Sequence, residues 1–260
     1  MEKVAIKAMT GWRFGMLCAA QIWLAHTIAF FSHEYAHSFT AWLLGFKMNP
    51  WLLHFGTLSF SNVIAMMQVN ENVDYDLIYA QGHNYLAALI GFAGFGIGNV
   101  LLYVLCRVIL AARKISLTPM WRLFFFWLCL MNVGNFYDYI PIRTIDPQGD
   151  IAHIVTGLAC SPWTVLIVLG IPTTWTLWHL FWRLLPQAMA QSFPGQPRRQ
   201  EVLRAVSIYL VFVFFAGVGL FSQSHVSKVL AGLSFLFALL VLAYLRYGRR
   251  QPEARLSERS

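Results

Sequence analysis

Long apolar runs separated by short polar stretches make up most of the chain. Six of these runs come close to or exceed the ~20 residues that a helix needs to cross the hydrocarbon core of a bilayer. The pattern predicts an all-α polytopic membrane protein. Its membrane helices are expected at about Phe14–Leu44, Tyr85–Leu110, Trp121–Tyr137, Ile151–Leu185, Val202–Phe221 and Val226–Tyr247.

Two of the predicted boundaries leave room for another arrangement. The fourth run contains two helix-breaking signals, Ser161-Pro162 and Gly170-Ile171-Pro172, so a break at either place is an open alternative. Between the first two helices, the segment Trp51–Val69 is rich in residues that favour strands. We expect a short strand pair or hairpin there, with an ordinary loop as the alternative. A free strand edge could hold an extended substrate by strand addition.

Composition agrees with a membrane protein. Hydrophobic residues make up 58% of the chain and charged residues only 12%, whereas soluble domains carry about 25% charged residues. We expect one integral membrane domain over residues 1–260. It would have a core at about 14–160, peripheral helices at about 162–247 and a disordered polar tail at 249–260. The four cysteines are scattered and form no CxxC pair, so they are expected to be packing residues.

The basic residues predict an orientation. The net charge is +8, but lysines and arginines fall between the apolar runs and at the termini, with no arginine-rich arm, so nucleic acid is not an expected partner. If six helices cross with the N-terminus inside, 16 of the 19 basic residues lie on the cytoplasmic side. The positive-inside rule therefore favours cytoplasmic termini. The size of the chain suits a bacterial inner membrane.

The most informative motif is His33-Glu34-Tyr35-Ala36-His37, inside the first apolar run. Two histidines four residues apart project from the same helix face, so both can ligate one zinc ion. The glutamate between them can then act as the general base toward a water molecule. Glu34 is also the only acidic residue deep inside an apolar run, and an intramembrane carboxylate indicates a functional site. Ordinary hydrogen bonds between helices are the alternative for the histidines.

The chain resembles the site-2 protease family of intramembrane zinc metalloproteases. That family carries His-Glu-x-x-His in one membrane helix, which His33–His37 matches in full. A second motif, Asn-x-x-Pro…Asp-Gly, opens a later helix and supplies an aspartate as the third zinc ligand. Here it is matched loosely. Asp138 stands at the asparagine position, and Asp146 has the family's usual spacing but is followed by Pro147 instead of glycine.

Two aspartates compete for the third ligand position. Asp146-Pro147 has the form of a helix N-cap followed by proline at the first helical position, and this needs no metal. Asp150 would then lie in the first helical turn, where it can point back toward the histidines. We therefore expect Asp150 as the third ligand, with Asp146 as the alternative. Asn135 is a candidate to orient a substrate carbonyl or stabilise an oxyanion, with a plain interhelical hydrogen bond as its alternative.

The resemblance covers about Phe14–Val155 and implies a zinc-dependent endopeptidase that cuts within or near a transmembrane segment of a protein substrate. In that reading, Glu34 is the catalytic base and Zn²⁺ the cofactor. The expected partners are a transmembrane protein substrate and the lipid bilayer. Whether an accessory membrane protein also takes part is an open question. The alternatives are a non-catalytic membrane scaffold of the same fold, or a metal or proton transporter. The positive-inside orientation places the motif toward the extracytoplasmic side.

Overall fold

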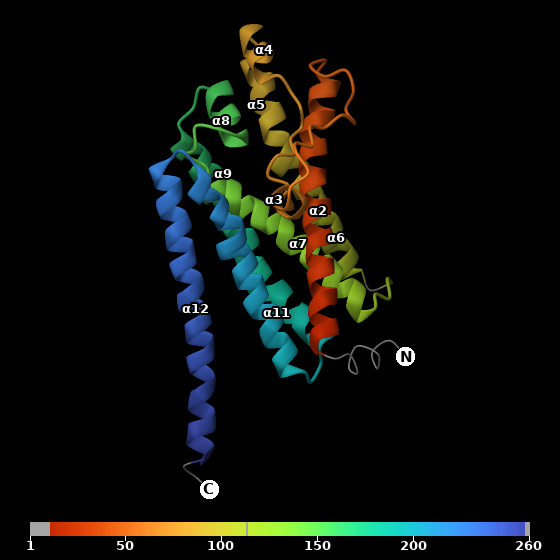
Figure 1. Cartoon of the computed structure of the whole chain (residues 1–260), viewed down its shortest axis with the longest axis vertical. Coiled ribbons are helices and arrows are strands. Elements are labelled where there is room, and N and C mark those ends of the chain that lie inside the picture. Colours follow the sequence, from red (N-terminus) through yellow and green to blue (C-terminus); the bar gives the residue numbers. More distant parts are fainter. Residues whose placement is uncertain (1–10, 113, 258–260) are drawn as a thin grey trace.

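The computed structural model describes residues 11–112 and 114–257, with side chains up to Arg246, and shows a bundle of long helices (Figure 1). Five helices in these residues are long and apolar enough to cross a membrane. The chain thus has the make-up of a multi-pass membrane protein. The five candidate spans are Gly11–Leu43, Asn84–Ala111, Pro162–Ser192, Pro197–Phe221 and His225–Arg246.

Several of the candidate spans are built from consecutive helical elements. The first is the single helix α2 (Gly11–Leu43). The fifth span likewise lies within one helix, α12 (His225–Ser257), whereas in the other three a π-helical or 3₁₀ turn interrupts or ends the α-helix without ending the span. In chain order the elements of these three are α5 (Asn84–Ala93), η1 (Gly94–Asn99), α6 (Val100–Ala111), α9 (Pro162–His179), η3 (Leu180–Leu184), α10 (Leu185–Ser192), α11 (Pro197–Tyr209), η4 (Leu210–Phe215) and η5 (Ala216–Phe221).

The predicted third helix forms as α7 (Pro119–Tyr137) but is not among the five candidate spans. Two asparagines, Asn132 and Asn135, lower its hydropathy. The position of α7 in the bundle explains how it can contain these asparagines. Helices α2, α6, α9 and α10 all contact α7, and 14 of its 19 residues are buried. A helix enclosed by protein can carry polar groups that a lipid-facing helix excludes.

The predicted fourth helix is broken at the first of its two signals. It divides into α8 (Asp150–Gly157) and α9, and the Ser161 hydroxyl caps the start of α9 by accepting a hydrogen bond from Trp163 N. Pro162 then occupies the first helical position, where its missing N–H costs nothing. Pro172, at the second signal, lies inside α9 without ending it.

The hairpin predicted over Trp51–Val69 is wrong. In its place the chain has a short helix, α3 (Phe60–Ala65), and one isolated bridge between His54 and Asn70. Asn62 explains the difference, because its side chain donates to two loop carbonyls and accepts a hydrogen bond from a backbone N–H. These bonds satisfy the loop backbone in place of a strand ladder. A second short helix, α4 (Tyr75–Ala80), leads into α5.

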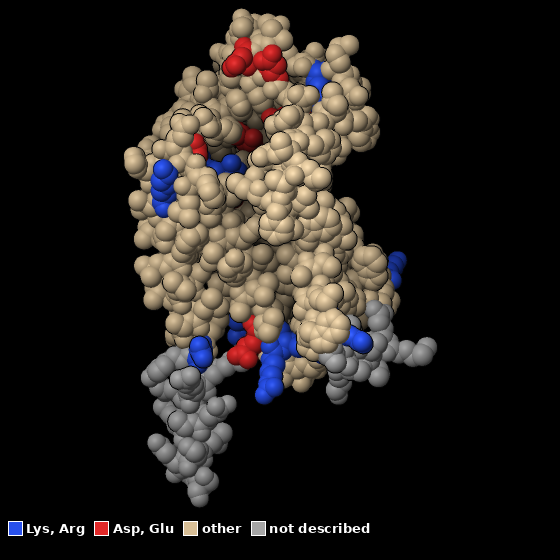
Figure 2. Space-filling view, in the orientation of Figure 1, with Lys and Arg blue, Asp and Glu red and all other residues tan. Residues whose placement is uncertain are grey.

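The first turn of α2 and the last turns of α12 lie at the same end of the molecule (Figure 1). Lysine and arginine side chains gather at that end in Figure 2, and the acidic side chains in view lie mostly toward the other end. Residues 249–257 of the tail that we expected to be disordered continue α12. Residues 258–260 lie outside the described part of the chain.

Candidate metal centre

Three buried side chains bring their ligand atoms together where α2 meets the start of α8. His33 and His37 lie one turn apart on α2, and their Nε2 atoms are 3.0 Å apart. The Oδ2 atom of Asp150 lies 2.9 Å from His33 Nε2 and 3.1 Å from His37 Nε2. Two ligands about 2.1 Å from a tetrahedral zinc ion are separated by roughly 3.4 Å. The spacing of the three atoms is therefore close to that of a metal coordination shell.

A chain of amides sets the tautomer of His33. Asn99, the last residue of η1, donates from its Nδ2 to Ala29 O at 3.0 Å and to Asn132 Oδ1 at 2.9 Å. Its Oδ1 therefore faces His33 Nδ1, at 2.9 Å. An amide oxygen only accepts, so Nδ1 of neutral His33 carries the proton and donates it. The Nε2 atom of His33 is left with a lone pair.

His37 is fixed in the same way by a backbone carbonyl. Its Nδ1 lies 2.6 Å from Ile90 O, which can only accept, so this nitrogen is also the donor. Both Nε2 lone pairs then point at each other and at the carboxylate oxygen of Asp150. Three acceptors within about 3 Å of one another are stable only with a cation or added protons between them. Two imidazoles and one carboxylate suit a catalytic zinc ion.

Glycines in η1 allow the backbone to come this close to the histidines. A Cβ added at Gly94 would lie 2.2 Å from His37 Nε2 and 2.5 Å from His33 Nε2. At Gly98, one turn further along, it would lie 2.3 Å from Ser32 O. Side chains at these positions would separate η1 from α2 and remove Asn99 from His33.

Asp150 reaches the histidines because of the turn in front of it. Gly149 precedes α8 with φ of 84°, a backbone conformation that glycine adopts without strain, and Asp150 is the first helical residue. Asp146 was expected as the cap of this helix, and that expectation is wrong. Its Oδ1 accepts from Gln148 N at 3.3 Å, within the loop. The structure thus places Asp150 with His33 and His37 and leaves Asp146 outside the cluster.

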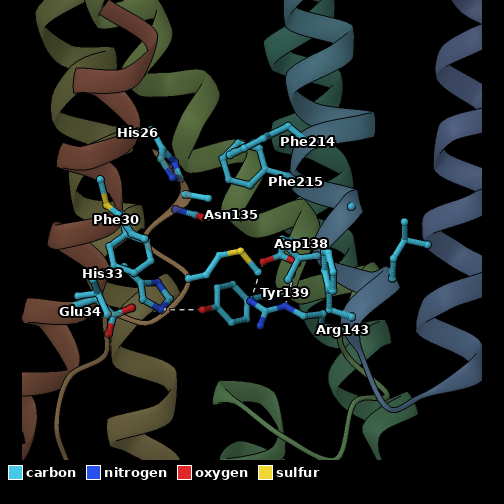
Figure 3. A pocket seen from close by; sticks show the side chains of 18 residues that line it. His26, Phe30, His33, Glu34, Asn135, Asp138, Tyr139, Arg143, Phe214 and Phe215 are labelled. Atoms are coloured by element: carbon cyan, nitrogen blue, oxygen red, sulfur yellow. Dashed lines mark hydrogen bonds and ion pairs between the residues drawn. The ribbon is translucent and has the colours of Figure 1, made fainter. Parts of the chain in front are cut away.

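Glu34 and His33 line a cavity of about 480 Å³ that extends from the cluster between α2, α7 and the turns η4 and η5 (Figure 3). The Glu34 side chain, next to His33 on the apolar helix α2, is buried. Asn135 is also in the wall of this cavity, as a substrate-orienting residue would have to be. Aromatic and apolar side chains make up most of the remaining wall, among them Phe30, Phe214 and Phe215.

The opposite wall of the cavity is formed by η2 (Asp138–Ile142) and the residues after it. Arg143 donates two hydrogen bonds to the Asp138 carboxylate, at 2.9 Å and 2.6 Å, and its guanidinium lies 4.2 Å from the centre of the Tyr139 ring. Burial raises the pKa of Asp138, and the Arg143 guanidinium opposes that shift. The Tyr139 ring stacks on His33, with 5.0 Å between ring centres. This wall is therefore ordered by charge and stacking.

Some residues of the site carried little signal in the sequence. Tyr139 and Arg143 lie in the loop that we searched for a third ligand, but nothing in their spacing indicated contact with His33. Gly94 belongs to a run of closely spaced glycines that ends just before Asn99. Such runs are also common in ordinary helix packing. Asn132 makes the interhelical hydrogen bond that was the plain alternative for such residues. Only the fold shows that this bond supports a candidate ligand.

Comparisons with protein-family models, curated proteins and solved structures return no match for this chain. Membership of the site-2 protease family therefore stays a prediction, based on the motifs alone.

Proposed function

We propose that the protein is a zinc-dependent intramembrane endopeptidase, a divergent member of the site-2 protease family. One observation carries the proposal: ligand atoms of His33, His37 and Asp150 converge within about 3 Å of one another, beside the buried carboxyl of Glu34. A scaffold has no need to bury four polar groups in this way, because each unpaired group lowers stability. This region also holds the fully matched His-Glu-x-x-His motif.

The roles of the residues follow from their chemistry. His33, His37 and Asp150 would hold the ion, which when bound supplies a Lewis acid for a peptide carbonyl and a more acidic water. Glu34 accepts the proton of the attacking water and delivers it to the amine nitrogen as the C–N bond breaks. Water adds across the peptide bond, and Glu34 returns to its starting state. Asn135, in the cavity wall, would hydrogen-bond to the substrate backbone.

The lining of the cavity supports an apolar polypeptide as the substrate. Phenylalanine and methionine side chains surround the approach to Glu34, and a volume of about 480 Å³ holds only a few residues of a chain. A substrate helix would have to unwind locally, since the carbonyls of an intact helix are hydrogen-bonded within it. We infer a transmembrane segment that binds in extended form.

The charge distribution supports an orientation in the membrane. The end where α2 begins also carries Arg107, Arg122 and the arginines at the start of α11. The positive-inside rule makes this end cytoplasmic and places the metal cluster in the outer half of the membrane. A bacterial inner membrane is the proposed location.

The proposed function is tested with purified protein and a library of single-span test segments in liposomes, with products identified by mass spectrometry. Wild type should generate new peptide termini that disappear in Glu34→Gln while bound zinc is retained. Glu201→Gln, the same chemical change in α11 outside the cavity, should cleave like wild type. Cleavage that persists in Glu34→Gln would contradict the assigned base, and zinc-loaded wild type that cleaves no segment would count against the peptidase.

A further inference from the structure

The Tyr139 hydroxyl is the polar atom of the opposite wall that comes closest to the metal cluster. It lies 3.1 Å from His33 Nε2, and the dashed line in Figure 3 marks this contact. In neutral His33, Asn99 holds the proton on Nδ1, so Nε2 accepts and Tyr139 is the donor. A bound cation would take this lone pair and free the Tyr139 proton for another acceptor.

The position of the hydroxyl favours a donor over a metal ligand. A fourth ligand of a tetrahedral ion lies at similar distances from the other three. The hydroxyl instead approaches the cluster from the His33 side, and its hydrogen bond to the cluster is to His33. It lines the same cavity as Glu34. A carbonyl oxygen drawn toward the cluster from this cavity would thus come within reach of the Tyr139 proton.

The surroundings of the ring hold the hydroxyl in place. The His33 ring stacks on the Tyr139 ring at an interplanar angle of 12°, and the Phe95 ring stacks on it at 5.7 Å between ring centres. The Arg143 guanidinium over the ring is itself fixed by Asp138. A cation over an aromatic face withdraws electron density, which makes the phenol a stronger hydrogen-bond donor. A donor held in advance is what stabilisation of a developing charge requires.

We propose that Tyr139 donates the hydrogen bond that stabilises the negative charge developing on the carbonyl oxygen of the scissile peptide. The inference rests on the proposed function and adds one residue to it. Tyr139 keeps its proton throughout, so the proton balance between water, Glu34 and the leaving amine is unchanged. Neither sequence motif points to this position, which sits between the Asp138 and Pro141 positions of the loosely matched second motif.

The test uses the full-length protein loaded with Co²⁺, whose visible absorption reports on the ion and its ligands. Tyr139→Phe keeps the ring and removes the hydroxyl. Loss of the competing hydrogen bond to His33 should tighten Co²⁺ binding about fivefold. Acetohydroxamate, a probe whose oxygens bind such ions, should bind the Co²⁺-loaded variant about tenfold more weakly than wild type. A purely structural role would weaken both.

Tyr137→Phe is the matched control, because it removes a hydroxyl that donates to Ser234 Oγ at 3.0 Å, away from the cavity. It should leave both affinities unchanged. As a second variant, 3-fluorotyrosine in place of Tyr139 keeps the fold and strengthens the donor, so it should tighten acetohydroxamate binding about twofold. Unchanged acetohydroxamate binding in both position-139 variants would overturn the proposal. So would loss of Co²⁺ in Tyr139→Phe, which would make Tyr139 a ligand. If wild type binds no Co²⁺ or Zn²⁺, the proposed function itself fails.

Discussion

Helices α7 and α12 are both predicted from apolar runs, yet α7 is buried inside the bundle and α12 lies at its edge. In α7, 14 of 19 residues are buried, and two of them are asparagines. In the described part of α12, the buried residues form a single stripe of small side chains, and leucines and phenylalanines face outward. Figure 1 shows α12 at the edge of the molecule, whereas α7 runs through its middle.

The contrast shows where polar chemistry can reside in such a chain. A polar side chain in contact with lipid is costly, but the same side chain enclosed by protein finds partners. Asn132 in α7 extends the hydrogen-bond chain through Asn99 to His33. The hydroxyl of Ser234 in α12 only donates to a carbonyl of η4 and accepts from Tyr137. The inner helices therefore support the candidate site, and the outer ones cover it.

Two glycines give the largest expected difference between inner and outer helices. Gly94→Ala would force a methyl group onto the Nε2 atoms of His33 and His37, so we expect zinc affinity to fall by about 100-fold, as measured by competition with a chelator. Gly170→Ala in α9 places its methyl group in open space and should leave zinc binding unchanged. It should also raise stability slightly, because alanine is the better helix former. Equal zinc affinities in the two variants would show that the close approach of η1 to the histidines is not needed for zinc binding.

Leucine truncation compares the packing of the two helices directly. Leu130 in α7 is fully buried, and Leu239 in α12 is 65% exposed. Leu130→Ala should lower the free energy of unfolding by about 3 kcal/mol through the cavity it creates, and Leu239→Ala by less than about 0.5 kcal/mol. Reversible unfolding in mixed micelles measures both. Similar losses would show that α12 is packed as an inner helix.

Asn132→Leu tests the hydrogen-bond chain behind His33. Removing the Asn132 carbonyl leaves one hydrogen of the buried Asn99 amide without its partner, so stability should fall by about 2 kcal/mol. Zinc affinity should fall about tenfold, since His33 loses a fixed tautomer and orientation. Chelator competition and unfolding on the same preparation separate the two effects. A loss of stability with unchanged zinc affinity would show that Asn132 does not affect zinc binding.

The smallest effect is expected at the corresponding polar position of the outer helix. Ser234→Ala removes a hydrogen bond to Phe212 O and the acceptor of Tyr137. We expect about 1 kcal/mol of lost stability and no change in zinc affinity, by the same two measurements. A change in zinc affinity would mean that the outer helices also position the ligands.

Sequence patterns predicted the helices because apolar runs of membrane length have few other structures open to them. Helix-breaking residues marked Ser161-Pro162 as one of two places for a break, and His33 and His37 followed from helical spacing. The failures arose where side-chain hydrogen bonds or a glycine turn overrode the local pattern. Asn62 organises the loop after α2 through bonds to backbone groups up to seven residues away, so strand-forming residues gave the wrong hairpin. Asp146 had the form of a helix cap, but the helix begins at Asp150.

The residues around the ligands were also beyond reach of sequence reasoning. Asn99 meets His33 across 66 positions of the chain, and Tyr139 meets it across 106. No local pattern connects residues so far apart. Asp150 was favoured because a first-turn carboxylate could point back to α2, and this geometry is what the structure shows.

The central claim is tested most directly by the zinc content of the detergent-purified protein. Wild type should hold about one zinc ion per chain. His33→Ala and Asp150→Ala should lose it, and Asp146→Ala, which removes a carboxylate from the same loop, should keep it. Zinc that persists in His33→Ala and Asp150→Ala, or a wild type that takes up none after supplementation, would contradict the metal centre and leave a membrane scaffold as the better account.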